Sequence, residues 1–390
     1  MSDTGKSTPT KLIHNRSGGR LQPTVNPPIE RGSTLLMDNT DALYGEGKTY
    51  GRMGLSVHRE LEAALCELEN AEAARLTSCG VSACALAISS VVKAGDHVLF
   101  LDNVYGPTRR FCERRLSRMG VSQSRVSPRI TSEELKDSIQ DNTRLLVLET
   151  PGSLTFELCD TLALIEVCKS NNVLTVLDNT WGCGLYHKPL DIGVDISVQA
   201  LTKYPVGHAD AFGGAVLTND PKLSTLVANT AEDWGISIGP DDAYLTLRGI
   251  RTLPARLAAH EKAAAKIADW LAEQPEVQSV LHPARSDHPD HHIWQRDFTG
   301  SCGLFAFYLN AQSQAQTEAF LDALTLFGQG FSWGGYESLL IACDPQLNRR
   351  TSPWANPGPG ALMRIHIGLE DISDLMDDVQ AGFNAMKGYE

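Results

Sequence analysis

The sequence lacks several features that would place the protein in a membrane or on nucleic acid. No apolar run approaches the roughly 20 residues of a membrane-spanning helix, and Met1 to Lys6 do not form the apolar core of a secretory signal. Basic residues are outnumbered, with 34 Lys and Arg against 47 Asp and Glu, which gives a formal net charge of −13. This balance argues against nucleic acid or an anionic membrane as a partner. We therefore expect a cytoplasmic protein with neither partner.

The sequence also has few cysteines and histidines at the spacing that is typical of metal ligands. The nine cysteines are an odd number spread along the chain, which is typical of reduced, buried side chains rather than of disulfides. Cys79 and Cys84 have four residues between them and no second pair follows at ligand spacing, so we expect no zinc site. Histidines also cluster at His288, His291 and His292. That cluster lies in a polar loop with proline, and we do not expect it to bind metal.

What the sequence does contain is an ordinary globular composition and alternating secondary-structure patterns. The chain has 390 residues, of which 42% are hydrophobic, enough for two or three domains. Short apolar runs predict strands that alternate with helical patterns, at 97–101, 144–149, 173–178 and 194–198. Such alternation predicts an α/β fold with a mostly parallel sheet covered on both faces.

The expected domain organisation follows from the same patterns. Residues 1 to about 25 are polar, and we expect a loosely ordered tail there. A long amphipathic helix at 255–273 is expected to lead into a second, smaller C-terminal α/β domain. The predicted divisions are an N-terminal arm, a large domain that binds the ligand, and a small domain, at 1–54, 55–250 and 251–390.

Two residues at predicted strand ends suggest a specific chemistry. Lys203 follows the 194–198 strand, and Asp178 ends the buried-type strand before it. Lysines are mostly exposed, so a lone lysine would usually be a surface residue. Enzymes that use pyridoxal phosphate (PLP) need a lysine that forms a Schiff base and an acid that pairs with the pyridinium nitrogen. In parallel sheets ligands bind at the carboxyl ends of strands, where both residues lie.

The residues around this pair resemble a known family. Thr202-Lys203-Tyr204-x-x-Gly207-His208-x-Asp210, preceded by Asp178-Asn179-Thr180-Trp181, is similar to the PLP-dependent enzymes of Cys/Met metabolism. The resemblance extends from about Asn26 to Phe383. It implies an enzyme with the fold-type I PLP-dependent transferase fold and PLP as its cofactor.

The resemblance also implies roles for individual residues. Cofactor-binding roles fall on Lys203, Asp178, Tyr105, Gly80, Val81, Thr202, Tyr50 and Arg52. Catalytic roles fall on Lys203, Tyr105 and Tyr50, and substrate-binding roles on Arg364, Ser332 and Trp333. Tyr105 would stack on the cofactor ring, and Gly80 and Val81 would hold its phosphate at a helix N-terminus. Arg364 would bind the substrate carboxylate, and Tyr50 with Arg52 would reach the phosphate of a neighbouring subunit.

Each role has a plainer alternative. The alternatives are a packed turn for Tyr105, an ordinary turn before a helix for Gly80, an edge-strand arginine for Arg364 and a surface turn for Arg52. Two positions also depart from the pattern of many relatives, because Ala200 and Ala209 occupy positions where serine is common. The first departure removes one expected hydrogen bond to the phosphate.

Three stretches are similar to the β-lyase branch of the family: Thr49-Tyr50-Gly51-Arg52, Pro151-Gly152-Ser153 and Ser332-Trp333-Gly334-Gly335-Tyr336-Glu337-Ser338. This similarity implies a carbon–sulfur lyase of methionine biosynthesis that cleaves cystathionine, an amino-acid thioether, to homocysteine, pyruvate and ammonia. It also implies a homotetramer, a dimer of dimers with shared active sites. The alternatives are a γ-lyase, a γ-synthase, a general cysteine-conjugate lyase, or a non-catalytic regulator with the same fold.

Overall fold

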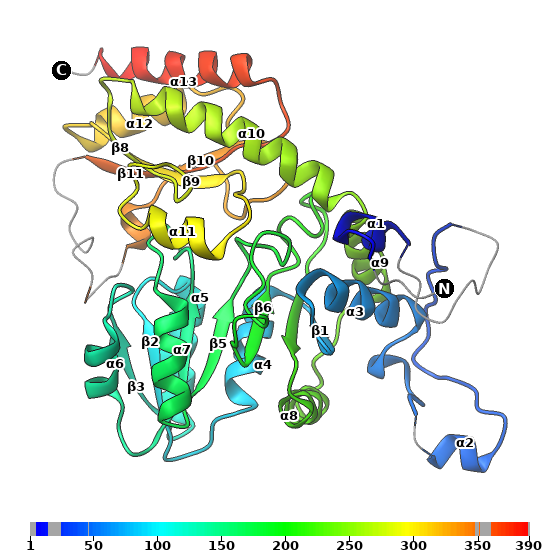
Figure 1. Ribbon diagram of the computed structural model, residues 1–390. Helices are drawn as coiled ribbons and strands as arrows, with labels where there is room; N and C mark the ends of the chain where they lie inside the picture. The colour runs from blue at the N-terminus through cyan, green and yellow to red at the C-terminus, as the bar shows by residue number, and fades with distance from the viewer. Residues whose placement is uncertain (1–4, 15–24, 46, 348–350, 352–359, 389–390) are drawn as a thin grey trace.

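The computed structural model describes residues 5–14, 25–45, 47–347, 351 and 360–388. Its main feature is a seven-stranded sheet (Figure 1). The strands are β1 Ala73–Thr77, β2 His97–Leu101, β3 Ser122–Val126, β4 Thr143–Glu149, β5 Leu174–Asp178, β6 Ile196–Gln199 and β7 Gly214–Thr218. Their order is β1-β7-β6-β5-β4-β2-β3. Only β7 runs antiparallel to its neighbours, β1 and β6. The prediction of a mostly parallel sheet is therefore confirmed.

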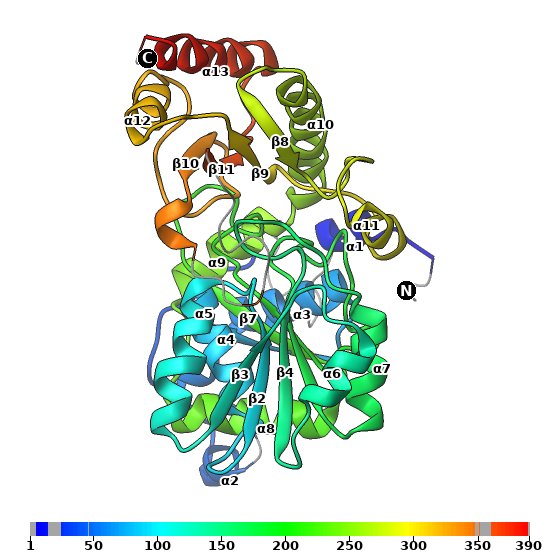
Figure 2. The same ribbon diagram turned by 90° about the vertical axis from the view of Figure 1, so that its left-hand side faces the viewer.

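Helices lie on both sides of this sheet (Figure 2). They are α3 Ser56–Glu69, α4 Gly80–Ser89, α5 Gly106–Phe111, α6 Ser132–Ser138, α7 Thr161–Ser170, α8 Pro221–Asp233 and α9 Pro240–Ile250, with a π-helical turn at Cys112–Leu116 that extends α5. In α3 the leucines Leu61, Leu65 and Leu68 are all buried. Their spacing of three and four residues puts them on one helix face, which packs inward.

A second sheet follows in the C-terminal part of the chain. Its strands are β8 Val277–Leu281, β9 Leu304–Leu309, β10 Leu339–Ala342 and β11 Ala361–His366, all antiparallel in the order β10-β11-β9-β8. The helices here are α10 Leu253–Ala272, α11 His291–Asp297, α12 Gln314–Asp322 and α13 Ile372–Met386. The core contains Phe305, Phe307, Phe320 and Phe383. This arrangement confirms the expected α/β fold class, while the domain limits at 54 and 250 stay predictions.

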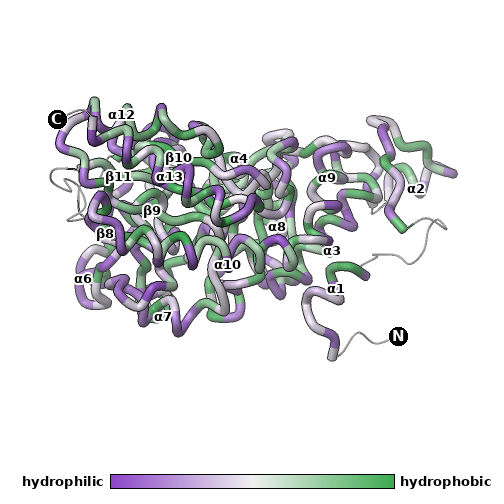
Figure 3. The backbone as a smooth tube through the Cα atoms, turned by 90° about the horizontal axis from the view of Figure 1, so that it is seen from above, coloured by the Kyte–Doolittle hydropathy of each residue, from purple (hydrophilic) through white to green (hydrophobic). Residues whose placement is uncertain are grey.

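The N-terminal region differs from the expected loosely ordered tail. Residues Thr8–His14 form helix α1, in which Leu12 is buried and Lys11 forms an ion pair with Glu67 at 2.9 Å. The expectation is wrong for this helix because one leucine and one lysine attach it to α3. Downstream lie α2 (Thr40–Tyr44) and a 3₁₀ turn at Gly51–Met53. Figures 1 and 3 place α1 and α2 at the end of the molecule away from the C-terminus.

The described ranges were compared with the requirements of a membrane-spanning helix and of a metal site. Within them, no helix has both the length and the apolar character needed to cross a membrane. Nor do these ranges hold any group of three or more His, Cys, Asp or Glu side chains that could bind a metal ion. The histidine-rich turn contacts another part of the chain. There Asp290 accepts two hydrogen bonds from Arg129, at 2.9 and 2.8 Å.

Candidate active site

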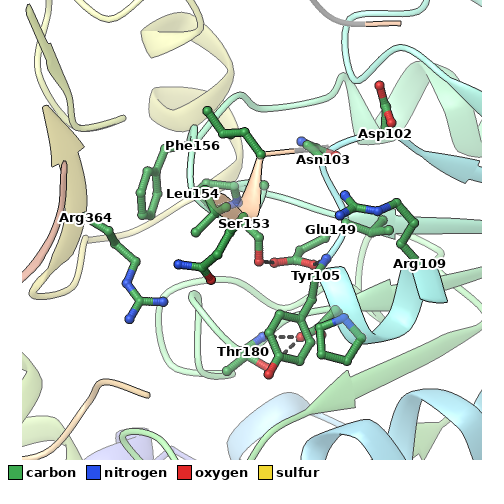
Figure 4. Close-up of a pocket in the computed structure, with 18 of the residues that line it drawn as sticks. Asp102, Asn103, Tyr105, Arg109, Glu149, Ser153, Leu154, Phe156, Thr180 and Arg364 are labelled. Atoms are coloured by element: carbon green, nitrogen blue, oxygen red, sulfur yellow. Dashed lines mark hydrogen bonds between the residues drawn. The ribbon is translucent and has the colours of Figure 1, made fainter. Parts of the chain in front are cut away.

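A cavity of about 390 Å³ opens at the carboxyl ends of the parallel strands. Its lining includes Tyr105, Asp178, Trp333 and Arg364, and Figure 4 shows Tyr105 and Arg364 entering from different sides. Tyr105 and Asp178 come from the large sheet region, whereas Arg364 lies on β11. The site is thus formed between the two sheets, with the strand ends as its floor.

Lys203 lies in the turn that follows β6 and directs its amine at the Ser332 loop. Its Nζ donates a hydrogen bond of 2.7 Å to Ser332 Oγ and lies 5.3 Å from the centroid of the Trp333 ring. Burial, together with the positive charge of Arg364, lowers the pKa of the amine to about 8 against the opposing charge of Asp178. At this pKa about a tenth of the amine is neutral at pH 7, far more than for an ordinary lysine, and the neutral form is the one that acts as nucleophile and base.

Asp178 ends β5 and is held by three donors. The backbone N–H and hydroxyl of Thr180 donate to Oδ1, at 3.1 and 2.5 Å, and the Cys84 thiol donates to Oδ2 at 3.6 Å. Burial raises the pKa of the Asp178 carboxyl, and the hydrogen bonds from Thr180 lower it. The carboxyl group is therefore fixed in orientation and would favour a positively charged partner. No local pattern predicted a role for Thr180 or Cys84, because their contacts depend on where the strand end places the carboxylate.

The Ser332 loop connects Lys203 with Arg364. Besides accepting from Lys203, Ser332 accepts a hydrogen bond of 3.1 Å at its carbonyl from Arg364 Nη2. Its φ of 77° is in the left-handed region, which is uncommon for a residue other than glycine. At Gly334 a Cβ would lie 2.7 Å from the Tyr204 nitrogen, so only glycine allows this close packing. The loop thus brings the amine and the guanidinium to one place.

Tyr105 is positioned by a residue that the sequence did not single out. Glu149 ends β4 beside Asp178, accepts a hydrogen bond of 2.5 Å from the Tyr105 backbone N–H, and accepts a second of 2.7 Å from the Ser153 hydroxyl. Burial raises the pKa of the Tyr105 hydroxyl, and the nearby Glu149 charge raises it further. The phenol therefore stays protonated at neutral pH, and its ring remains partly exposed toward the cavity.

The N-terminus of α4 packs against the Lys203 segment. Gly80 is the first residue of this helix, and a Cβ there would lie only 2.5 Å from Ala200 Cβ. The N-cap residue, Cys79, makes no side-chain capping bond. Val81 continues the same first turn, whose backbone N–H groups have no partner within the helix. This is the geometry that binds an anion such as a phosphate.

Three of the expected cofactor-binding residues do not line this cavity, and each makes another contact in the structure. The Thr202 hydroxyl exchanges hydrogen bonds with the backbone of Gly213, donating to its carbonyl at 3.2 Å and accepting from its N–H at 3.1 Å. Tyr50 and Arg52 do not line the cavity of their own subunit. They contact each other, with the Arg52 guanidinium 5.9 Å from the Tyr50 ring centroid.

These residues fit PLP. The buried amine of Lys203 would supply a covalent anchor, and the oriented acid Asp178 would supply a partner for a ring nitrogen. The helix start at Gly80 would supply a phosphate cradle. The cradle at Gly80 is the most specific of the three observations. A Cβ at Gly80 would force α4 away from Ala200, close to Lys203 in sequence.

Comparison with known proteins gives a consistent result. Residues 9–384 match the family described as Cys/Met metabolism PLP-dependent enzyme. The chain is 40% identical to cystathionine beta-lyase of Escherichia coli (strain K12), covering 97% of this chain and 98% of that one. It is 33% identical to a cystathionine gamma-synthase of Mycobacterium leprae (strain TN), covering 96% of each.

A solved structure agrees in fold. Cystathionine gamma synthase from Xanthomonas oryzae pv. oryzae, crystallised with aminoacrylate and cysteine, superposes with a TM-score of 0.93. Its sequence is 30% identical, and the match covers 99% of this chain and all of that one. The chain is therefore an enzyme that belongs to the Cys/Met metabolism PLP-dependent family, and its cofactor is pyridoxal phosphate.

Proposed function

We propose that this enzyme is a carbon–sulfur β-lyase that cleaves cystathionine to homocysteine, pyruvate and ammonia in methionine biosynthesis. The observation that carries the proposal is the pairing of Lys203 and Arg364 through Ser332, at 2.7 and 3.1 Å. An amine able to take a proton thus stands beside a guanidinium able to hold an α-carboxylate. The similarity to a relative named cystathionine beta-lyase supports the choice among the family's reactions.

Substrate binding follows from the arginine. Arg364 has a planar fork of donors that matches a carboxylate, and burial strengthens such a contact. Its Nη2 is already oriented by the Ser332 carbonyl, so little side-chain freedom would be lost on binding. The bound amino acid would then present its α-carbon to Lys203, whose amine lies 5.3 Å from the centroid of the Trp333 ring at the cavity wall.

The chemistry assigns one task to each remaining residue. When bound, PLP supplies the electron sink for the negative charge that develops at the α-carbon. Lys203, held by Ser332, removes the Cα proton. An ionised Asp178 would pair with the positively charged ring nitrogen of the cofactor and stabilise that charge. The Cβ–S bond then breaks, the sulfur leaves with the electron pair and takes a proton, and the three-carbon fragment is hydrolysed to pyruvate and ammonia.

The keto acid formed from cystathionine distinguishes this function from its relatives. Purified enzyme is expected to release pyruvate and homocysteine in equal amounts, because elimination from the β-carbon leaves three carbons. Elimination on the γ side would give 2-oxobutyrate and cysteine instead. Chromatography of the derivatised keto acids measures both. Predominant 2-oxobutyrate would show a γ-lyase, and no keto acid without an added nucleophile would point to a synthase or a regulator.

We further propose that the active sites are shared between subunits, within a dimer-based assembly such as a homotetramer. Tyr50 and Arg52 do not line the cavity of their own chain, and they lie at the start of and within the 3₁₀ turn Gly51–Met53 that precedes α3. Tyr50 is 46% exposed, as expected for a residue available to a neighbour. In this arrangement the arginine fork would bind the phosphate of the PLP in the adjacent subunit.

Mixing two inactive variants is expected to restore part of the activity. A Lys203→Ala subunit retains its own Arg52, and an Arg52→Ala subunit retains its own Lys203. In a mixed dimer with crossed sites, one site would have both intact residues and the other would have neither. Co-expression with two different tags allows the mixed form to be isolated and assayed. Mixed dimers that remain inactive would show that Arg52 acts within its own subunit.

A further inference from the structure

A buried carboxyl group outside the cavity has no part in the chemistry described above. Glu69 is the last residue of α3, its side chain is fully buried, and it does not line the cavity. Its Oε1 accepts hydrogen bonds from two side-chain amides, from Asn179 Nδ2 at 2.9 Å and from Gln199 Nε2. Burial raises the pKa of the Glu69 carboxyl, and the hydrogen bonds from these amides lower it. Burial of such a group is unfavourable without hydrogen bonds, so the two amides that it joins indicate its role.

Both amides adjoin the candidate catalytic residues in the chain. Asn179 directly follows Asp178 at the end of β5, and Gln199 ends β6, four residues before Lys203. The ladder between these strands pairs Asp178 with Val198, and its last bond runs from the Asn179 backbone N–H to the Val198 carbonyl at 2.8 Å. Beyond this point the ladder ends, so side-chain contacts hold the two strand ends together.

The two strand ends are held from both faces. Asp178 and Thr180 line the cavity and neither amide does, as expected because successive residues of a strand point to opposite faces. On the cavity face, where Figure 4 shows Thr180, its hydroxyl donates to Asp178 Oδ1 at 2.5 Å and accepts a bond of 2.9 Å from the Ala200 backbone N–H. On the other face Glu69 joins the two amides. The end of β5 and the turn that carries Lys203 are thus fixed to each other from two sides.

The surroundings of Glu69 hold this arrangement in place. Asn179 Nδ2 also donates to the His187 carbonyl at 2.9 Å, and Asn179 Oδ1 accepts from the His187 ring at 3.1 Å. The Asn179 carbonyl accepts a bond of 2.8 Å from the Cys183 backbone N–H. Gly184 has a φ of 67°, and a Cβ there would lie 2.6 Å from Glu69 Cγ. Glu69 is therefore packed in one position, from which it can orient both strand ends.

We propose that Glu69 is a positioning residue, which aligns the strand ends that carry Asp178 and Lys203 from the face opposite the cavity. The arrangement requires an oxygen that accepts both amide hydrogens, and it does not require a negative charge. A neutral acceptor of the same shape should therefore replace Glu69, whereas an apolar side chain should not. This inference rests on the proposed roles of Asp178 and Lys203, and it adds to them a residue that touches neither substrate nor cofactor.

Removing the acceptor should change how the folded enzyme holds its cofactor. Glu69→Leu leaves both amides without their partner, so the visible circular dichroism per bound PLP, which reports the orientation of the cofactor, should fall. The pH midpoint of the visible absorbance should rise by roughly 0.5 unit, a fraction of the roughly 1–3 units that a close opposite charge produces. The reason is that a ring nitrogen less well paired with Asp178 withdraws less charge from the Schiff base with Lys203. The kcat for pyruvate formation should fall roughly tenfold, because displaced reacting groups lose rate steeply.

Three further variants complete the test. Glu69→Gln retains an oxygen that accepts both amides and should keep all three readouts close to those of wild type. Gln199→Met removes one of the two donors and should change the readouts in the same direction by less, which tests the inference even if Glu69→Leu does not fold. Glu60→Leu is the control, because Glu60 is a buried glutamate of the same helix, roughly 13 Å from Glu69 along its axis. It should leave the cofactor readouts unchanged, whatever its effect on thermal stability.

The outcomes distinguish positioning from a contribution to fold stability alone. Wild-type circular dichroism and pH midpoint in folded Glu69→Leu, with only a lowered Tm, would overturn the inference, as would unchanged readouts in Gln199→Met. A Glu69→Gln enzyme that behaves like Glu69→Leu would also overturn it, since charge and not an acceptor would then matter. An equal change in Glu60→Leu would do the same. PLP attached to a lysine other than Lys203 in the wild-type enzyme would instead refute the proposed roles in the site itself.

Discussion

Replacing Lys203 with alanine is expected to lower the rate of pyruvate formation by roughly 10³-fold or more and to remove the visible absorbance of the bound cofactor. In the proposed mechanism the amine serves both as the covalent anchor and as the base, and a positioned base alone contributes about 10²- to 10⁴-fold. Its pKa of about 8, lowered by burial, suits both tasks. Absorbance spectra of the purified variant and a coupled pyruvate assay measure the two losses.

The Lys203→Ala variant should remain folded. Burial disfavours the charged amine, so its removal should not lower thermal stability, which differential scanning calorimetry can check. Lys93→Ala is the control because Lys93 is an exposed lysine of the same domain. It should keep full absorbance and turnover. A Lys203→Ala enzyme that retained cofactor colour and more than a tenth of its activity would contradict the assignment.

Replacing Arg364 with alanine is expected to lower kcat/KM for cystathionine by roughly ten- to 150-fold. A charge-assisted hydrogen bond to a buried group is worth about 1.5 to 3 kcal/mol, and this loss appears in transition-state binding. Cofactor content should stay normal, because Arg364 contacts the Ser332 carbonyl rather than the cradle at Gly80. Steady-state kinetics and the ratio of absorbance to protein concentration provide the two readouts.

The conservative variant sharpens this test. Arg364→Lys keeps the positive charge and loses the planar fork, so its kcat/KM should fall between those of wild type and alanine. Spectral titration with L-alanine, which carries the carboxylate, and with methylamine, which does not, separates binding from chemistry. Only L-alanine should bind more weakly to Arg364→Ala. Equal weakening of both ligands would mean that the substitution disturbs the Ser332 loop instead of a carboxylate site.

The positions of candidate residues at strand ends could be predicted from the sequence. Lys203 and Asp178 could be found because each follows a buried apolar run, and the parallel register then brings β5 and β6 together. Gly80 could be found because small residues precede a helical pattern. These are local features, because an apolar run or a turn of small residues is recognisable within a few positions of the sequence.

Long-range contacts in the site could not be predicted. Ser332 and Lys203 are joined by a hydrogen bond between residues far apart in sequence. The same holds for Glu149, which positions Tyr105 across two strand ends. Such partners depend on loop paths that no local pattern specifies. Helix α1 was missed for a related reason, since it depends on burial of Leu12 against α3 rather than on its own polar sequence.

We propose that the site is built around Lys203, and locating the cofactor on the chain tests this role. Reduction of the holoenzyme with borohydride fixes the cofactor to the amine that holds it, and mass spectrometry of the digested protein then identifies the modified peptide. We predict one modified peptide, containing Lys203 and its neighbours Thr202 and Tyr204. A reduced cofactor found on any other lysine, with Lys203 unmodified, would contradict the account.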